Sequence, residues 1–380
     1  MNDDVKIIVL RTERGEGKPN ADCMLFGRTL EQWVISGVRG METESADYVE
    51  GEDILPVVRP LLSASRPITA VLYSDTPLLS YSSVSNSLSR FRTAGINALR
   101  LPRGWILKTE YARVCEKIVA DNIMTLGDED FVTVFNYNQL AYASDILRSR
   151  INYYHMNAGV RLDDPATTEI DAFVVIEPGA RIGAFCAIKG NSVIRAGAEI
   201  GARCDICSSV IERGAKVISS TLDGALVAKN AEVGPYARLR PGARIGAGAK
   251  IGDFVEIKNS RIGAGSKVCH LAYVGDADTG EDCNIGAGTV FANYDGSVKH
   301  RSRLGRRVFV GSNSTIVAPV DIGDGAFIAA GSVVTEDVPC GALAIGRAIT
   351  KVKENWKNNA YTRDAEDKTT APEEDANSGS

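Results

Sequence analysis

Three side chains in this sequence combine a reactive or charged type with a spacing that could place them on one surface. His270 is one of only three histidines, and a neutral imidazole suits general-base chemistry because its reference pKa of about 6.5 lies near working pH. Arg240 and Lys258 each directly follow an aliphatic residue and lie three repeat units apart. Two stacked cations repel unless an anion bridges them, and a phosphate would do so. The alternatives are a structural role for His270 and two solvated surface residues for the cations.

A six-residue repeat must position these side chains. Aliphatic residues recur six apart, with occasional five-residue steps and Thr279 as a weak member, and glycine often follows them. The series is Ile176, Ile182, Ile188, Ile194, Ile200, Ile206, Ile211, Val217, Val233, Leu239, Ile245, Ile251, Ile257, Ile262, Val268, Val274, Thr279, Ile285, Leu304, Val310, Ile316, Ile322, Ile328 and Val334. Each unit is long enough for one short strand and one corner, with the aliphatic residue pointing inward. The pattern predicts a parallel β-helix, whereas an α/β domain would need helices for which the units leave no room.

Residues three units apart share a slot on successive coils, about 4.8 Å from each other. In the hexapeptide families that this pattern resembles, three units complete one coil of a left-handed triangular prism, against the usual right-handed crossover. His270 takes the third position of its unit, and Ala287 takes the same slot one coil later. Ser312 and Ala330 hold this position in later units. The small residues predict a shallow track along the prism in which a long, flexible ligand could lie.

The repeat breaks between Phe291 and Leu304. The intervening stretch "ANYDGSVKHRSR" is too long for a corner, so we expect it to leave the prism as a loop. Loops that project from rigid scaffolds often carry function. This loop offers Asn293, Tyr294 and Lys299 as candidate site residues.

Domain organisation follows from the change of pattern along the chain. Residues 1–158 have strand-like stretches at 5–10 and 68–75 and helical spacing at 29–38 and 137–159, which predicts a small α/β domain with a parallel sheet. Residues 160–171 read as an entry segment. The β-helix is expected over 159–346. An arm and a polar, acidic tail are expected over 347–380, with the tail disordered.

Composition narrows the class of protein. The net charge of -5 gives no basic footprint for nucleic acid. We expect no membrane span, since no apolar run is long enough, and a cytoplasmic location, since the N-terminus lacks a signal-peptide pattern. Cys204 and Cys207 have metal-like spacing but no second pair and fall in repeat slots, which favours a structural role.

The prism half resembles a known family, the bifunctional N-acetylglucosamine-1-phosphate uridyltransferase/glucosamine-1-phosphate N-acetyltransferases. The resemblance runs from about Val160 to Trp356. It rests on "GPYARLRPGARIG", "GDFVEIKNSRIG", "GSKVCHLAYVGDADTG", "NIGAGTVFANYDG", "VFVGSNSTIVAPV", "IAAGSVVTEDV" and "ALAIGRAITKVKENW". It implies N-acetylation of glucosamine 1-phosphate by acetyl-CoA, a step of UDP-N-acetylglucosamine biosynthesis, and a homotrimer with the acetyl-CoA site between neighbouring prisms.

The resemblance also implies roles for individual residues. His270 matches the general base, and Asn293 matches a residue beside the acetyl group. From the chemistry of acyl transfer we expect backbone N–H groups or Asn293 to stabilise the oxyanion, and Glu256, two residues before Lys258, to orient the imidazole. The residues matched to the sugar phosphate are Arg240, Lys258, Tyr273 and Asn284. The residues matched to acetyl-CoA are Ala287, Asn293, Tyr294, Lys299, Ser312, Ala330 and Arg347.

The resemblance thins in the first domain. The family's glycine-rich nucleotide loop is reduced to Gly15 and Gly17 in "VLRTERGEGKPNADCML". Asp75 and Asn136 could be remnants of the magnesium ligands, but too few residues lie between them for the family's sugar-binding region. We therefore expect a reduced nucleotidyltransferase-like domain without a metal, with Mg²⁺ needed only if residual uridyl transfer exists. The alternatives are another amino sugar phosphate as substrate, a bifunctional enzyme, or a non-catalytic trimeric regulator.

Overall fold

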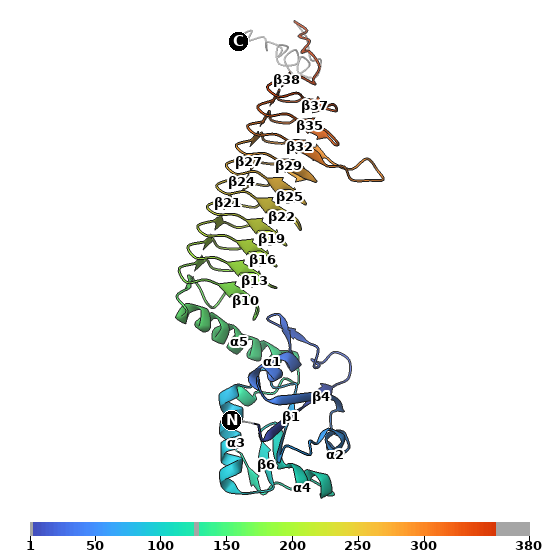
Figure 1. The fold of residues 1–380 in the computed structure, drawn as a ribbon, viewed down its shortest axis with the longest axis vertical. Helices are drawn as coiled ribbons and strands as arrows, with labels where there is room; N and C mark the ends of the chain where they lie inside the picture. Colours follow the sequence, from blue (N-terminus) through green and yellow to red (C-terminus); the bar gives the residue numbers. More distant parts are fainter. Residues whose placement is uncertain (1–2, 125–128, 355–380) are drawn as a thin grey trace, which may run out of the picture.

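The computed structural model describes residues 3–124 and 129–354. An α/β part and a long triangular prism follow each other along the chain, and a helix lies between them (Figure 1). The tail predicted from residue 364 onward lies outside the described residues. Among the described helices, none combines the length and the apolar character needed to cross a membrane.

A six-stranded sheet forms the centre of the α/β part, in the order β4-β1-β5-β7-β6-β8. Its strands are β1 (Val5–Glu13), β4 (Glu42–Val49), β5 (Ile68–Tyr73), β6 (Ala98–Leu101), β7 (Gly104–Lys108) and β8 (Asn122–Ile123). The sheet is parallel around β1, as predicted, and β7 pairs antiparallel with both β5 and β6. A short antiparallel pair lies outside it, β2 (Met24–Leu25) and β3 (Arg28–Thr29).

Helices cover both faces of this sheet because successive residues of β1 point to opposite sides. Ile7 and Val9 pack with α1 and α3 residues in one cluster, and Ile8 and Leu10 pack with α2 and α4 residues in another. The helices are α1 (Leu30–Gly37), α2 (Leu55–Val58), α3 (Tyr81–Ala94), α4 (Thr109–Val114) and α5 (Tyr137–Asn157), with 3₁₀ turns η1 (Arg59–Leu61) and η2 (Glu129–Phe131). The helices and strands predicted for this part are confirmed as α1, α5, β1 and β5.

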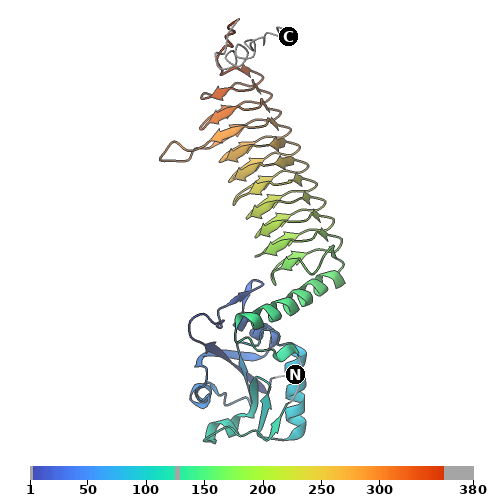
Figure 2. The same ribbon diagram turned by 180° about the vertical axis from the view of Figure 1, so that it is seen from behind.

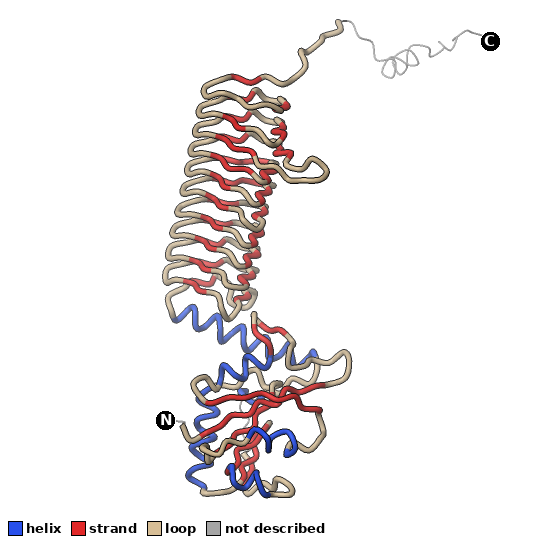
Figure 3. The backbone as a smooth tube through the Cα atoms, turned by 45° about the vertical axis from the view of Figure 1, so that its right-hand side comes forward, coloured by secondary structure: helices blue, strands red, loops and turns tan. Residues whose placement is uncertain are grey.

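The prism has three faces, each a column of parallel strands, and the predicted left-handed β-helix is confirmed (Figures 2 and 3). The ten-stranded face consists of β10 (Glu169–Ile170), β13 (Ala187–Lys189), β16 (Asp205–Cys207), β19 (Thr221–Asp223), β22 (Arg238–Leu239), β25 (Glu256–Lys258), β28 (Tyr273–Gly275), β31 (Val290–Ala292), β34 (Thr315–Val317) and β37 (Val333–Val334).

The nine-stranded face consists of β11 (Val175–Ile176), β14 (Val193–Ile194), β17 (Val210–Ile211), β20 (Leu226–Val227), β23 (Arg244–Ile245), β26 (Arg261–Ile262), β29 (Ala277–Thr279), β32 (Ser302–Leu304) and β35 (Asp321–Ile322). The eleven-stranded face consists of β9 (Arg161–Leu162), β12 (Arg181–Ile182), β15 (Glu199–Ile200), β18 (Lys216–Val217), β21 (Glu232–Val233), β24 (Lys250–Asp253), β27 (Lys267–His270), β30 (Asn284–Ile285), β33 (Phe309–Val310), β36 (Phe327–Ile328) and β38 (Leu343–Ala344). The predicted entry segment 160–171 already contributes β9 and β10.

The interior of the prism is the predicted aliphatic ladder, and every member of the series is buried. Between Ile176 and Val334 the ladder also contains three residues that the series omitted, Leu222, Val227 and Phe291. The first two were missed because two successive five-residue steps lead from Val217 to Val227 and interrupt the period of six. At its base the ladder is covered by α5, since Ile151 and Met156 pack against the prism core.

Candidate functional site

Two edges of the ten-stranded face carry the candidate residues. We call the edge where the eleven-stranded face runs into the ten-stranded face the first corner, and the edge where the ten-stranded face runs into the nine-stranded face the second corner. His270, at the end of β27, lies at the first corner, and Asn293, just after β31, lies at the second. The strands of the face between these corners are only two or three residues long, so groups on both corners can reach one small ligand.

The first corner carries the predicted column of small residues above His270. Register and backbone hydrogen bonds between successive coils place Ala287, Ser312 and Ala330 in the slot of His270. Ser312 and Ala330 are exposed, and Ala287 is half-buried. The column therefore leaves an open track that begins at the imidazole and runs toward the C-terminal end of the prism.

The coil below His270 supplies a carboxylate that the sequence-based assignment missed. Asp253 pairs with His270 in register, and its Oδ1 lies 2.5 Å from Nδ1 of the imidazole. The hydrogen bond from His270 lowers the pKa of the Asp253 carboxyl. The imidazole side chain remains 60% exposed. With Nδ1 held by Asp253, Nε2 is the nitrogen left free to accept a proton from a ligand.

Glu256, the group assigned to orient the imidazole, contacts Arg240 in this structure, whereas Asp253 contacts His270. Oε1 of Glu256 accepts a hydrogen bond from Nη1 of Arg240 at 2.9 Å, and this contact raises the pKa of Arg240. Glu256 opens β25 on the ten-stranded face, whereas Asp253 and His270 end strands of the eleven-stranded face. The slot rule could have found Asp253, because the step from Asp253 to His270 equals the step from Ile251 to Val268.

The predicted stack of cations is confirmed on the ten-stranded face. Leu239 pairs with Ile257, which places Arg240 and Lys258 in one slot on successive coils. The pKa of Lys258 is lowered, first by contact with the Lys299 ammonium and then by burial. Three cationic side chains, those of Arg240, Lys258 and Lys299, therefore gather here, and the Glu256 carboxylate pairs with Arg240.

Tyr273 completes this face from the next coil. A methyl group on Gly275 would lie 2.3 Å from the Tyr273 hydroxyl, so the phenol lies over the bare glycine. Gly275 pairs in register with Lys258. The missing side chain at Gly275 thus allows the phenol to lie close to the cations, and together they form a surface suited to an anion with hydroxyl groups.

The second corner is organised by a buried carboxylate that the sequence-based assignment also missed. Asp276 accepts hydrogen bonds from the amides of Asn259 and Asn293, and Nζ of Lys258 lies 3.9 Å from its Oδ2. Burial alone would raise the pKa of Asp276, but the two amides and the nearby cations outweigh it and leave the pKa lowered. Asn293 is itself buried, and Asp276 fixes its amide nitrogen.

The loop after β31 leaves the prism as predicted and projects from the second corner (Figures 1 and 2). Tyr294 and Lys299 face each other across an antiparallel bridge, and the Tyr294 hydroxyl donates to the Gly296 carbonyl at 2.6 Å. Asp295 closes the turn by accepting from the backbone amides of Ser297 and Val298. The bridge returns Lys299 toward the prism, where it meets Lys258.

Two predicted site residues lie apart from His270. Asn284 opens β30 level with Lys267, so three residues of strand, about 10 Å, separate it from the slot of His270. Arg347 follows β38 at the far end of the prism, where the preceding Gly346 bonds to Ser332 and Val333. Within one chain, His270 therefore lies next to the column of small residues, whereas Asn284 does not contact the imidazole.

The proposed remnant metal ligands of the α/β part are engaged by protein groups. The buried Asp75 carboxylate forms ion pairs with the guanidinium groups of Arg14 and Arg103, the latter at 2.7 Å. Oδ1 of Asn136 caps α5 by accepting from the Gln139 amide at 3.0 Å. These residues do not fit a magnesium site as they stand, because two guanidinium groups hold the carboxylate.

The sequence of this chain is similar to a family model and to several known proteins. Residues 301–336 match the family model described as Bacterial transferase hexapeptide (six repeats). The chain is 43% identical over 240 residues to the Bifunctional protein GlmU of Desulfitobacterium hafniense, which covers 62% of this chain and 53% of that protein. It is 45% identical over 235 residues to the protein of the same name from Nitratidesulfovibrio vulgaris, which covers 60% of this chain and 52% of that protein.

The chain is similar to the GlmU proteins over about three fifths of its length. It spans about half the length of these curated GlmU relatives. Among solved structures, the UDP-N-acetylglucosamine acyltransferase of Francisella novicida is 17% identical with a TM-score of 0.35, covering 48% of this chain and 66% of that one. The similarity to GlmU therefore agrees with the family named from the sequence motifs.

Proposed function

We propose that this protein is an acyltransferase that moves the acetyl group of acetyl-CoA to the amino group of glucosamine 1-phosphate, a step toward UDP-N-acetylglucosamine. The observation that carries the proposal is the placement of His270, backed by Asp253, beside the face that bears Arg240 and Lys258. The 43% identity to a GlmU protein supports it.

In this proposal the ten-stranded face holds the sugar phosphate. Arg240 offers a guanidinium fork and Lys258 a point charge to the phosphate, with Tyr273 beside them. The sugar then reaches across the narrow face, so that its amine meets Nε2 of His270. The imidazole takes the proton that the attacking amine must lose, and the adjacent Asp253 carboxylate stabilises the imidazolium that forms.

The acyl donor follows the first corner in the same proposal. Ala287, Ser312 and Ala330 line the track for the pantetheine arm of acetyl-CoA, with Arg347 at its far end and Tyr294 and Lys299 on the loop. The amine forms the new C–N bond at the thioester carbonyl, the C–S bond breaks, and the thiol leaves with a proton. Backbone N–H groups and the remaining amide N–H of Asn293 are the donors for the oxyanion.

The test is release of free thiol. We expect the full chain to release CoA thiol when acetyl-CoA and glucosamine 1-phosphate are both present. Galactosamine 1-phosphate and glucosamine 6-phosphate in the same assay distinguish the proposed substrate from other amino sugar phosphates. A folded protein that releases no thiol with any of the three would reject the acyltransferase and favour the non-catalytic regulator.

We also propose a homotrimer, supported by a ridge of exposed apolar side chains at the first corner. Tyr236, Phe254 and Leu271 are 61%, 59% and 64% exposed, and the rings of Tyr236 and Phe254 stack at 5.5 Å. All three have left-handed backbone, with φ between 50° and 57°, a conformation that costs such residues about 1–2 kcal/mol each. A ridge of exposed apolar side chains beside His270 suits contact with other copies of the chain.

Light scattering after size-exclusion chromatography measures the assembly. We expect three times the mass of the chain, and we expect Phe254→Asp to yield a smaller species because it places a charge in the contact. Ser219→Asp, in the same corner slot lower on the prism, is the matched control. A wild-type monomer would contradict the trimer.

Uridyl transfer is not part of the proposed function, because Arg14 and Arg103 hold the carboxylate that would bind a metal. We expect no pyrophosphate release from UTP and N-acetylglucosamine 1-phosphate with Mg²⁺. Asp75→Asn should leave that result unchanged and lower thermal stability, since it leaves two buried cations with less counter-charge. Pyrophosphate release by the wild type that Asp75→Asn abolishes would restore the bifunctional hypothesis.

A further inference from the structure

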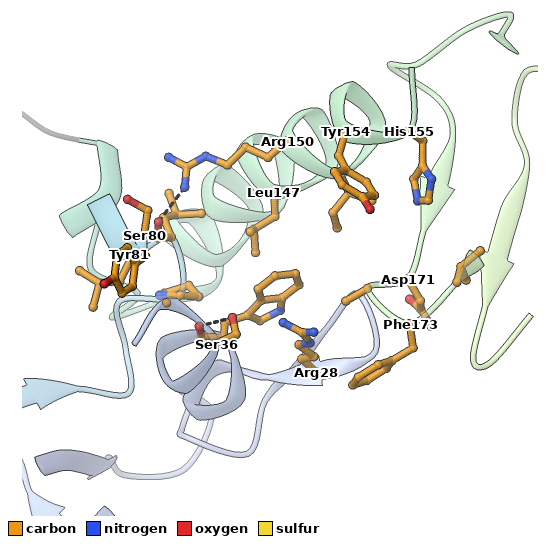
Figure 4. Close-up of a pocket in the computed structure, with 18 of the residues that line it drawn as sticks. Arg28, Ser36, Ser80, Tyr81, Leu147, Arg150, Tyr154, His155, Asp171 and Phe173 are labelled. Carbon is orange, nitrogen blue, oxygen red and sulfur yellow. Dashed lines mark hydrogen bonds between the residues drawn. The ribbon is translucent and has the colours of Figure 1, made fainter. Parts of the chain in front are cut away.

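A second cavity lies at the base of the prism, six coils below His270, or about 29 Å along the axis. It has a volume of about 570 Å³, and its walls come from β3, α1, the segment 77–81, α5 and the first coil. Figure 4 shows these side chains facing one another across the junction of the two parts. The volume is within the range of roughly 300–1,000 Å³ that small-molecule sites occupy.

Close packing holds the walls of this cavity in place. The Trp33 indole donates to the Leu25 carbonyl at 2.7 Å, which fixes the ring. Gly37 lets α1 approach the segment 77–81, because a Cβ there would lie 2.3 Å from the Leu79 carbonyl oxygen. Arg150 donates to the Leu78 carbonyl and to Asp130, both within 2.7 Å. The cavity is thus shaped by elements that are bonded to one another.

Aromatic side chains from three different elements line it. Trp33 comes from α1, Tyr154 from α5 and Phe173 from the first coil. Tyr154 and Phe173 are 70% and 49% exposed, which leaves their ring surfaces open to a ligand. Such rings prefer partners that are themselves flat and aromatic, in offset or edge-to-face contact.

A cation without a counter-ion lies among these rings. The Arg28 guanidinium lies 4.9 Å from the ring centroids of both Trp33 and Phe173. Among residues 3–124 and 129–354, no carboxylate forms an ion pair with this guanidinium and no protein group accepts a hydrogen bond from it, so its N–H donors are available to a ligand. Burial and the neighbouring Arg39 lower its pKa, as expected for a cation that lacks a counter-charge. Asp171, the one carboxylate in the lining, accepts instead from the Gly190 amide at 2.9 Å.

The imidazole of His155 adds a neutral polar group. The residue is 5% exposed, and burial lowers its pKa, so the ring is uncharged at neutral pH. It contacts the Tyr154 ring edge-on at 5.3 Å, and no described residue forms a hydrogen bond with it. The Arg28 guanidinium and the His155 imidazole both line the cavity and provide it with hydrogen-bond donors and an acceptor for a polar ligand.

We propose that this cavity binds a small planar aromatic ring that carries an anionic group, a carboxylate or a phosphate. The ring contacts Trp33, Tyr154 and Phe173, and the anion accepts hydrogen bonds from Arg28. The charge of Arg28 and the three rings from separate elements carry this inference, and it is independent of the chemistry at His270.

Calorimetric titration of the full chain tests the proposal with defined probes. Naphthalene-2-carboxylate and AMP represent the two sources of the anion, and naphthalene-2-carboxamide is the uncharged match of the first. We expect at least one anion to bind, and the carboxamide to bind at least about tenfold more weakly, the effect of losing one charged hydrogen bond. The tighter anion identifies the source.

Variants locate the binding. Arg28→Gln and Phe173→Ala should each weaken the anion about tenfold or more, and Trp33→Phe should remove a fluorescence change on binding. Arg203→Gln is the matched control, because Arg203 also lies over a ring, that of Phe185, but outside the cavity. Absence of binding by both anions, equal binding of the carboxamide, or unchanged binding by Arg28→Gln together with Phe173→Ala would each overturn the proposal.

Discussion

His270→Ala is expected to lower thiol release from acetyl-CoA and glucosamine 1-phosphate by a factor of roughly 10²–10⁴, the usual contribution of a positioned general base. The effect should fall on kcat more than on KM, since the imidazole accepts a proton only as the amine attacks. Stability should change little, because the side chain is 60% exposed and packs in no core. Steady-state thiol release with both substrates varied measures the two parameters.

His300→Ala is the matched control for this variant. His300 also forms a close pair with an aspartate, Nε2 lying 2.7 Å from Oδ2 of Asp295, but it lies on the projecting loop. We expect the activity of His300→Ala to stay within about threefold of the wild type, since the substitution removes only an exposed ion pair. Activity of His270→Ala equal to that of the wild type, in a protein with unchanged circular dichroism, would show that another group takes the proton.

Asp253→Asn is expected to lower kcat by roughly tenfold to a hundredfold. In a buried His–Asp pair the same substitution lowers kcat by about 10⁴. Solvent screens the pair here, because the side chains of His270 and Asp253 are 60% and 39% exposed. The hydrogen bond from His270 lowers the pKa of Asp253, so the carboxylate is charged around neutral pH. The Asp253 carboxylate of the wild type therefore stays negatively charged during the assay.

The pH profile separates a positioning role for Asp253 from a merely structural one. Loss of the negative charge removes an attraction for the proton on the imidazole, so the acidic limb of kcat/KM should move to lower pH in Asp253→Asn. Asp223→Asn, at the exposed end of β19, should leave the limb in place. If the acidic limb of kcat/KM in Asp253→Asn has the same midpoint as in the wild type, Asp253 does not position the imidazole.

Glu256→Gln distinguishes the two carboxylates that could serve the imidazole. Because Glu256 pairs with Arg240, its loss should change KM for the sugar phosphate and leave the acidic limb where it is. A shifted limb in Glu256→Gln with an unshifted one in Asp253→Asn would reinstate Glu256 as the orienting group.

The sequence predicted the prism because its fold is locally encoded. Each six-residue unit contains its own inward residue and corner, so period alone placed Ile251, Val268 and Ile285 in one column. The same rule placed Lys258 above Arg240 and Ala287 above His270. It failed at Leu222 and Val227, where consecutive five-residue steps change the period while the backbone still completes a coil.

By itself, then, the sequence determined the repeat, the slots and the residues that share a corner, because in a β-helix spatial neighbours lie at fixed separations along the chain. Only the tertiary structure decided which carboxylate meets which partner. Asp253 reaches His270 while Glu256 turns to Arg240, because side chains on opposite sides of one corner point to different faces of the prism. The cavity around Arg28 also required the fold, since its walls come from residues 28 to 175, which no repeat relates to one another.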